Sequence, residues 1–305
     1  MNHLQKHFSA SLIALAALLS TASMGALAAA TAPSLGSAAS FAALSNTALT
    51  CTGAAVVGDI GSLTAVTGFP PALLCTITGG TVTPVSVAQT AWNDLFVGTS
   101  STNSLLAAQA CDFNHTATEQ LSGQTLSSGV HCFPSDALLN GPLPLNLVGS
   151  GPWILRMGTQ LTTGGTQAAP ASVLVNGKAN CGSGVFWQIG SATIGAYTAM
   201  VGDILAYTSI GFTGPNSSLV GGAFANTAAV TMTGPTVTIS NVNCGAGGGG
   251  KGDGDGNDED KDHHDKDKDH KGDKDKDHKD DSRPSFKDFN LFEHDGNKDE
   301  HGDNR

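Results

Sequence analysis

Residues from about Ala32 to Cys244 follow one pattern of apolar and polar positions. Short β-prone runs of Val, Ile, Leu and Thr are broken every few positions by Gly, Asn or Pro. Such runs favour strands, and the breakers favour tight turns. The pattern therefore predicts many short strands joined by tight turns, in a segment large enough for one sizeable core.

One segment departs from this pattern. From Pro84 to about Cys111, apolar residues recur at helical spacing, and Pro84 is well placed at the start of a helix. We expect one long helix over about 84–110, with Gly98 to Thr102 as the place where it can divide in two. The apolar stripe consists of Val87, Ala88, Ala91, Trp92, Leu95, Phe96, Leu105, Leu106, Ala107 and Ala108.

An internal repeat lies near the end of this body. Residues 201–216 match residues 220–236, with an offset of 19 at the start and 20 at the end, and weaker copies lie at 185–198 and 153–163. Units of this length made of strands and turns cannot bury an apolar face alone, so they stack as coils of a β-helix. Stacking places equivalent residues about 4.8 Å apart. Thr213 would then lie beside Thr233, and Asn216 beside Thr236.

The two ends of the chain differ from the body. Residues 1–30 have a basic start, an apolar run from Leu12 to Leu19 and small residues up to Ala28, which is the pattern of a secretory signal peptide. The run is too short to span a bilayer. Residues 245–305 begin with glycines and continue as Asp, Lys, His and Gly in alternation, so we expect a linker and a disordered tail. The predicted regions are thus 1–30, 31–244 and 245–305, in a secreted protein with no membrane span.

Charge is segregated into that tail. Of the 15 Lys and Arg and the 26 Asp and Glu in the chain, 12 and 20 lie from Lys251 onward. Before it there are six acids and three cations, of which Lys6 is in the predicted signal peptide, so the body has only Arg156 and Lys178. Typical globular sequences are about one quarter charged. So few cations exclude a basic groove that binds phosphate groups, and they argue against nucleic acid as a partner.

Six cysteines follow the predicted signal peptide. An even number in an oxidising compartment favours three disulfides over metal ligation, and no CxxC spacing indicates zinc. The sequence leaves many pairings open. The simplest nested arrangement joins Cys51 to Cys75, Cys111 to Cys132, and Cys181 to Cys244.

Several stretches between residues 35 and 244 carry a resemblance to a known family. They are, in order, LGSAASFAAL (35–44), VGDIG (57–61), TAVTGFPP (64–71), AWNDL (91–95), LSGQTLSSGVHCF (121–133) and VFWQIG (185–190), followed by the repeats. As an ordered set they resemble the microbial ice-binding proteins. The resemblance implies an irregular β-helix flanked by one long α-helix, in an extracellular protein that adsorbs to ice through one flat solenoid face and slows ice growth and recrystallisation.

We therefore expect a mostly β fold: an irregular β-helix, right-handed and triangular in cross-section, with one long α-helix packed alongside and a disordered C-terminal tail. The residues alone do not fix the handedness. We further expect a monomer without catalysis, cofactor or metal, whose partner is the surface of an ice crystal. The sequence does not indicate a partner for the tail.

The resemblance also directs attention to a short motif, Thr-(Ala or Gly)-x-(Thr or Asn). It begins in this chain at Thr47, Thr64, Thr78, Thr163, Thr213 and Thr233. Residues three apart point to opposite faces of a straight strand, so either a corner or bulge lies within each motif or only one residue of each pair faces ice. Thr is also common in strands of every function. The predicted ice-binding residues are Thr47, Thr50, Thr64, Thr67, Thr213, Asn216, Thr233 and Thr236.

Other chemistry has weaker support. Asp59 and Asp203 both follow Val-Gly and precede Ile, but an Asp in a coil turn more often accepts hydrogen bonds from nearby backbone amides. A hydrolase or lyase would need two or more of Asp59, Asp136 and Asp203 in one cleft. His115 and His131 lack a recognisable Ser or Cys nucleophile.

The leading rival is a β-solenoid adhesin or carbohydrate-binding surface protein. It requires a groove lined by exposed Trp or Tyr, whereas ice requires a flat Thr face free of aromatic residues. Trp92, Trp153 and Trp187 lie at apolar-periodic positions, which favours the core. In the tail, residues 253–264 begin like a calcium loop, but Asp258 and His264 stand where that loop requires Gly and Glu.

Overall fold

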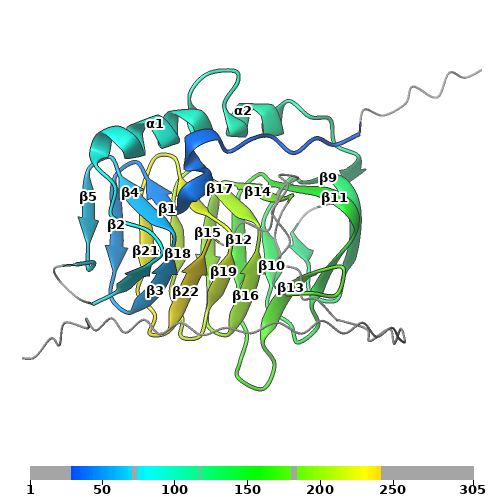
Figure 1. Ribbon diagram of the computed structural model, residues 1–305. Coiled ribbons are helices and arrows are strands. Elements are labelled where there is room, and N and C mark those ends of the chain that lie inside the picture. The colour runs from blue at the N-terminus through cyan, green and yellow to red at the C-terminus, as the bar shows by residue number, and fades with distance from the viewer. Residues whose placement is uncertain (1–28, 71–73, 117, 180–183, 242–305) are drawn as a thin grey trace, which may run out of the picture. The chain divides into compact units, whose positions relative to one another are not determined.

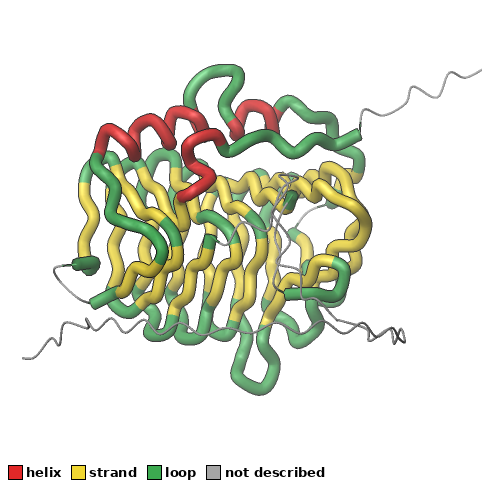
Figure 2. Tube along the Cα trace, in the orientation of Figure 1, coloured by secondary structure: helices red, strands yellow, loops and turns green. Residues whose placement is uncertain are grey.

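The computed structural model describes residues 29–70, 74–116, 118–179 and 184–241. The predicted signal peptide, the tail and the predicted disulfide between Cys181 and Cys244 lie outside these residues. The described chain winds into a solenoid of parallel strands with two helices along one side (Figure 1, Figure 2). No helix in these ranges is long and apolar enough to cross a membrane.

The strands of successive coils form three sheets. Over the regular part of the solenoid, each coil contributes one strand to each sheet in turn, as in β14, β15 and β16, followed by β17, β18 and β19. Every strand pair is parallel. The first sheet is named here the helix-covered sheet. Its strands are β4 (Asp59–Ser62), β1 (Phe41–Ser45), β20 (Ala223–Ala225), β17 (Asp203–Ala206), β14 (Val185–Ile189), β11 (Leu145–Met157), β9 (Thr125–Phe133) and β7 (Phe113–Asn114).

The second sheet is named the threonine sheet, and Figure 1 shows its strands side by side from β5 to β10. They are β5 (Ala65–Thr67), β2 (Ala48–Cys51), β21 (Val230–Met232), β18 (Ile210–Phe212), β15 (Ser191–Ile194), β12 (Gln160–Thr163), β10 (Ala137–Leu139) and β8 (Glu119–Gln120). The third sheet holds β6 (Thr76–Thr78), β3 (Ala54–Val57), β22 (Val237–Ser240), β19 (Ser218–Val220), β16 (Thr198–Val201), β13 (Ala171–Val175) and the first residues of β11.

The coils do not stack in the order of the sequence. The N-terminal strands β1 and β2 pair with β20 and β21 of the C-terminal repeat, so blue and yellow strands lie side by side in Figure 1. The chain must then return to the other end of the solenoid to begin β7. In the helix-covered sheet that return crosses eight strands, about 34 Å at the usual spacing. The helical segment makes this crossing.

That segment is two helices, not the single helix expected over about 84–110. They are α1 (Val85–Phe96) and α2 (Thr102–Ala107), and a short 3-10 helix, η1 (Gly36–Ser40), packs against α1. The break has a local cause: Gly98 has a φ of +85°, which favours glycine, and the Ser101 hydroxyl accepts a hydrogen bond from the Ser104 amide to cap α2.

Two apolar clusters hold the fold together. One fills the interior of the solenoid with inward residues of all three sheets, such as Leu161, Trp187 and Phe212. The other lies between the helix-covered sheet and the helices, where Ala88, Ala91 and Leu95 of α1 are buried at helical spacing. Only the helix-covered sheet is thus shielded on both faces.

The predicted stacking of the repeats is confirmed. Ile204 pairs with Ala223 and Ile210 with Val230, so the offset is 19 in one sheet and 20 in the next. The Thr233 amide donates to the Phe212 carbonyl, which sets Thr233 beside Thr213. Two predicted disulfides are also confirmed, Cys51–Cys75 and Cys111–Cys132.

Candidate functional site

The threonine sheet alternates cleanly between its two faces. Residues at one position of each strand, such as Leu161, Ile210 and Val230, are fully buried in the interior. Their register partners in the neighbouring strands are also apolar, so the inward face is a continuous part of the core. The residue that follows each of them points outward, as strand geometry requires.

These outward residues form what we call the central threonine row. Register pairs connect its members across six adjacent strands, and five of the six are threonines: Thr162, Thr193, Gly211, Thr231, Thr50 and Thr67. Neighbouring members are about 4.8 Å apart because they lie on adjacent parallel strands. The last two hydroxyls are in contact, Thr67 Oγ1 lying 3.3 Å from Thr50 Oγ1. At the other end, Gln160 Nε2 donates to Thr193 Oγ1 at 2.9 Å.

A second, shorter row of threonines runs along one border of the sheet. It consists of Thr213, Thr233 and Thr52, all exposed, and is named here the threonine rim. Their side-chain hydroxyls are partly fixed, because Thr233 Oγ1 donates to the Phe212 carbonyl and Thr52 Oγ1 to the Thr233 carbonyl. The rim lies two residues beyond the central threonine row, or about 6.6 Å along each strand. Together the rows make a two-dimensional array of methyl and hydroxyl groups.

The predicted residues Thr47 and Thr64 do not lie in either row. They occupy the turn between the helix-covered sheet and the threonine sheet, one position before the strands β2 and β5. Thr64 Oγ1 donates to the Asn46 carbonyl there. In each of these two motifs the first Thr is therefore at a corner, and only the last, Thr50 or Thr67, is on the central threonine row.

The predicted residues Asn216 and Thr236 also lie at a corner, on the border of the third sheet. Both have left-handed backbone conformations, with φ of +54° and +61°, as does Tyr197 in the coil below. Thr236 Oγ1 donates to Asn216 Oδ1 at 2.8 Å, so these two stacked corner side chains hydrogen bond to each other. The Thr-Gly-Pro motif thus makes the turn that ends the threonine sheet, and only Thr213 and Thr233 face the same side as the central threonine row.

The two remaining motif copies contribute nothing to the threonine sheet's surface. Thr163 points into the core, where its hydroxyl lies 3.2 Å from that of Thr198. Thr78 is exposed but belongs to β6 of the third sheet. Conversely, the motif search missed Thr52, Thr162, Thr193 and Thr231. A different signal marks two of them: Thr193 lies between Ala and Ile, and Thr231 lies between Val and Met, so each is a Thr between two apolar residues. Thr162 follows Leu161 but is followed by another Thr.

The outward surface of the threonine sheet is almost free of charge and of large side chains. Among its eight strands, Glu119 in the end strand β8 is the only charged residue. The outward positions before the central threonine row are small in most coils, including Ala48, Ala65 and Ser191. Small side chains at both borders and Thr in the middle make the surface flat.

The carboxylates singled out in the sequence do not converge. Asp59 Oδ1 accepts from the Thr81 amide and Asp203 Oδ1 from the Gly222 amide, the turn role that the sequence favoured. These two lie three strands apart, about 14 Å. Asp136 precedes β10 in another sheet, where hydrogen bonds from the Thr159 hydroxyl and the Gln160 amide lower its pKa. Burial raises the pKa of Asp203 to about 6. Among these three residues there is no shared cleft for acid and base catalysis.

His115 and His131 form a structural chain with other residues. His131 Nε2 lies 2.8 Å from the Ser127 carbonyl, and His131 Nδ1 lies 3.1 Å from His115 Nε2. His115 Nδ1 in turn lies 2.9 Å from a carboxylate oxygen of Glu119. Burial lowers the pKa of His131, which favours its neutral form. Cys132 beside it is in a disulfide, so no thiol is available as a nucleophile at this place.

The tryptophans are core residues, as their spacing predicted. Trp187 is fully buried and donates its Nε1 proton to the Val201 carbonyl at 2.8 Å, and Trp153 is buried in the same interior cluster. Trp92 of α1 is partly buried and packs against the apolar cluster beneath the helices. No outward residue in the eight strands of the threonine sheet is aromatic.

Comparison with known proteins gives one consistent result. The family model described as Ice-binding-like matches residues 43–238. A protein of Nostoc sp. (strain HG1) named Ice-binding protein is 35% identical over 204 residues, which cover 65% of this chain and 71% of that protein. Among solved structures, the ice-binding protein of the Antarctic ascomycete Antarctomyces psychrotrophicus has a TM-score of 0.58 and 31% identity, over 70% of this chain and all of that chain.

An ice-binding protein from an Antarctic biological consortium is similar to the same degree. Its crystal structure has a TM-score of 0.58 and 28% identity, over 70% of this chain and 92% of that chain. The family match spans most of the described solenoid, including both repeats and every strand of the central threonine row. The chain belongs to the Ice-binding-like family.

Proposed function

We propose that this protein is exported and binds ice through the threonine sheet, and that it thereby slows the growth and recrystallisation of ice. The observation that carries the proposal is the central threonine row, in which five of six stacked positions present the same side chain in the same register. A crystal repeats in two dimensions, so a binder gains most from groups that repeat in two dimensions as well. Family membership supports ice as the partner.

The chemistry of threonine suits such a surface. Its methyl group favours an ordered layer of water next to the sheet, and its hydroxyl joins that layer by hydrogen bonds. A charged group would hold its own hydration shell, which is costly to remove. The outward rows contain no charge between β5 and β12, so nothing there competes with the order of ice.

The proposed contact surface combines predicted residues with residues found in the structure. Thr50, Thr67, Thr213 and Thr233 belong to it, and so do Thr52, Thr162, Thr193 and Thr231. Thr47, Thr64, Asn216 and Thr236 border it at the corners and shape its edges. Rigidity comes from the parallel strand stack beneath, because Thr50, Thr162, Thr193 and Thr231 lie on strands that are paired on both sides; Thr67 lies on the edge strand β5.

The test is thermal hysteresis and ice recrystallisation with the full chain and with the double variant Thr50→Tyr/Thr231→Tyr. These two positions are register partners at the centre of the surface. Two bulky rings there should hold ice away from the neighbouring threonines and remove most of both activities. If the unmodified protein leaves ice growth unchanged, the proposed function is wrong. If the double variant keeps full activity, ice binds to another face.

A further inference from the structure

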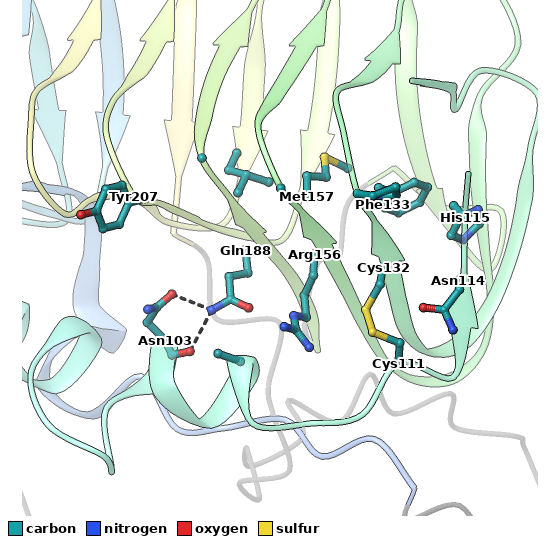
Figure 3. A pocket seen from close by; sticks show the side chains of 15 residues that line it. Asn103, Cys111, Asn114, His115, Cys132, Phe133, Arg156, Met157, Gln188 and Tyr207 are labelled. Carbon is teal, nitrogen blue, oxygen red and sulfur yellow. Dashed lines mark hydrogen bonds between the residues drawn. A yellow bond between two sulfur atoms is a disulfide. The ribbon is translucent and has the colours of Figure 1, made fainter. Parts of the chain in front are cut away.

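A groove lies at the corner between the helix-covered sheet and the threonine sheet, next to α2. Its volume is about 520 Å³, within the range of small-molecule sites. Figure 3 shows Gln188 of β14 extending toward Asn103 of α2 and Arg156 of the neighbouring strand β11 beside it, with Tyr207 at one end and the Cys111–Cys132 disulfide toward the other. No described residue that lines it is an Asp or Glu.

The groove begins where the character of one row of outward residues changes. On the helix-covered sheet, register pairs connect Asn114, Cys132, Arg156, Gln188, Leu205, Phe224 and Leu44 in one line across the strands. Leu205, Phe224 and Leu44 are buried in the cluster beneath the helices. Further along the same line, Gln188, Arg156 and Asn114 are polar and line the groove. The line of outward residues therefore continues across the sheet, but its apolar side chains give way to hydrogen-bonding ones.

Arg156 is the most informative residue in this groove. It is one of only two cations in the sequence between residues 31 and 244, and it is half-buried. Its Nη1 donates to the Gln109 carbonyl at 2.9 Å, just beyond the end of α2. Among the residues that the structure describes, no carboxylate lies within ion-pair distance of it. A guanidinium has five N–H donors, so most of its donors remain for a planar anion such as a carboxylate.

The neighbours of Arg156 add neutral hydrogen-bonding groups and an aromatic surface. Gln188 Nε2 donates to the carbonyl and to Oδ1 of Asn103, at 2.8 and 2.7 Å, which fixes both amides in place. Their free groups, Gln188 Oε1 and the Asn103 side-chain amide protons, can bind hydroxyl groups. Tyr207 is 63% exposed at the groove's end, and the corner residues Gly158 and Gly190 also line the groove.

We propose that this groove binds a saccharide that bears a carboxylate, of the uronic acid class. Arg156 pairs with the carboxylate, the amides of Gln188 and Asn103 bind ring hydroxyls, and Tyr207 provides an apolar face for a sugar ring. Each group matches one part of such a ligand. A neutral sugar would leave the Arg156 cation without a partner, and an acidic peptide would not use the ring of Tyr207 and the fixed amides of Gln188 and Asn103. The site is separate from the threonine rows, so the two binding activities are independent.

The test is calorimetric titration of the full chain with trigalacturonic acid and, as a matched neutral sugar, maltotriose. We expect saturable binding of the acidic trisaccharide only. Arg156→Gln should weaken it at least about tenfold, the loss expected when a charge-assisted hydrogen-bonded pair is removed. The control is Lys178→Gln, which removes the body's other cation, exposed beside β13, and should leave the affinity unchanged.

A second variant protects the test against misfolding, since Arg156 also contacts the Gln109 carbonyl. Tyr207→Ala changes an exposed residue and should weaken binding several-fold, whereas Tyr207→Phe should not; a circular dichroism melt checks each fold. The proposal is overturned if trigalacturonic acid gives no saturable binding, if maltotriose binds equally well, or if Tyr207→Ala binds like the parent. Equal binding of a synthetic peptide of residues 253–262, an acidic piece of the tail, would also overturn the saccharide assignment.

Discussion

The threonine sheet and the third sheet are made by the same coils, yet they present different surfaces. Both consist of short parallel strands with one buried face, and neither is covered by a helix. The line of outward residues in the third sheet reads Ser172, Ala199, Ser218, Thr238, Ala55 and Thr76. The corresponding line in the threonine sheet has five threonines. Stacking supplies the spacing for both, so the choice of one outward residue per coil makes the difference.

The borders of the two sheets differ as well. The third sheet begins at the left-handed corner residues Tyr197, Asn216 and Thr236, and β13 ends in a tight turn that carries the exposed cation Lys178. Its next outward positions include Val57 and Val220, which have no hydroxyl. The strands of both sheets are almost free of charge. The regular row of threonines is therefore what distinguishes the threonine sheet from the third sheet. The comparison identifies the threonine sheet as the better match to a crystal.

The largest expected effect on stability comes from the disulfide that ties the two sheets together. Cys51 ends β2 of the threonine sheet, and Cys75 immediately precedes β6 of the third sheet. The double variant Cys51→Ser/Cys75→Ser should lower the free energy of unfolding by about 2–4 kcal/mol, the usual value for a loop of this length. Chemical denaturation measures it.

The same variant sharpens the comparison of the sheets. Without this disulfide, the strands that carry Thr50 and Thr67 should be held less rigidly. Thermal hysteresis should then fall even at temperatures where the protein stays folded. The parallel double variant Cys111→Ser/Cys132→Ser, at the other end of the solenoid, is the control. If both pairs reduce hysteresis equally, the end of the central threonine row has no special part in binding.

Much of the fold was predictable because it is repeated locally. The 19- and 20-residue offsets between residues 201–216 and 220–236 require stacked coils, and the apolar stripe of residues 87–96 requires a helix. The stacking of β1 on β20 was not predictable, since it joins residues 180 positions apart without a repeated motif. The break at Gly98 was visible as a possibility, but the sequence left open whether the helix crosses it.

The site was only half predictable, for a geometric reason. A four-residue motif such as Thr213 to Asn216 identifies coil positions but contains a corner, so its last residue leaves the face on which its first residue lies. The outward face instead repeats with the two-residue period of a strand. Thr231 points outward, and its neighbours Val230 and Met232 point into the core. A search for Thr between two apolar residues finds Thr50, Thr193 and Thr231 of the central threonine row, but it also finds Thr238 of the third sheet. A search for the longer motif finds the corners.

The threonine rim should contribute less than the central threonine row. The double variant Thr213→Tyr/Thr233→Tyr should therefore reduce thermal hysteresis partly, because ice still meets Thr50, Thr193 and Thr231. The corner variant Thr236→Asn should leave hysteresis unchanged and keep a residue that tolerates the left-handed conformation. Complete loss of activity in the rim variant would move the centre of the binding surface to the rim.

A smaller gain should follow from filling the one gap in the central threonine row. A Cβ at Gly211 would lie 3.4 Å from Thr231 Oγ1 and 3.5 Å from Thr213 Cγ2, which are ordinary contacts. Gly211→Thr should stabilise the strand by about 0.5–1 kcal/mol and increase thermal hysteresis. The matched substitution Ala199→Thr in the third sheet should leave hysteresis unaltered. Lower activity of the stable Gly211→Thr protein would show that the row does not act as a continuous array.

A change of pH should have the smallest effect on ice activity, although it should change the free energy of unfolding. The pKa of Asp203 rises from its ordinary 3.8 to about 6 in the folded protein. The folded state therefore holds this proton more tightly than the unfolded state does. The resulting contribution to the free energy of unfolding, about 2–3 kcal/mol, is fully present below pH 4 and is lost as the pH rises through 6.

Asp203→Asn should therefore remove this slope in denaturation experiments between pH 4 and pH 7, while Asp59→Asn should keep it because Asp203 remains. Thermal hysteresis should stay constant over the same range in the parent protein, since the outward rows from β12 to β5 contain no titratable group. A hysteresis that follows the Asp203 titration would place the binding surface near that residue.

The most direct test compares two substitutions in one coil. Thr231 and Thr238 face outward from the consecutive strands β21 and β22, one on the threonine sheet and one on the third sheet. Thermal hysteresis should fall to a small fraction of the parent value in Thr231→Tyr and remain at the parent value in Thr238→Tyr, with equal melting temperatures. The reverse result, with activity lost only in Thr238→Tyr, would contradict the assignment of ice binding to the threonine sheet.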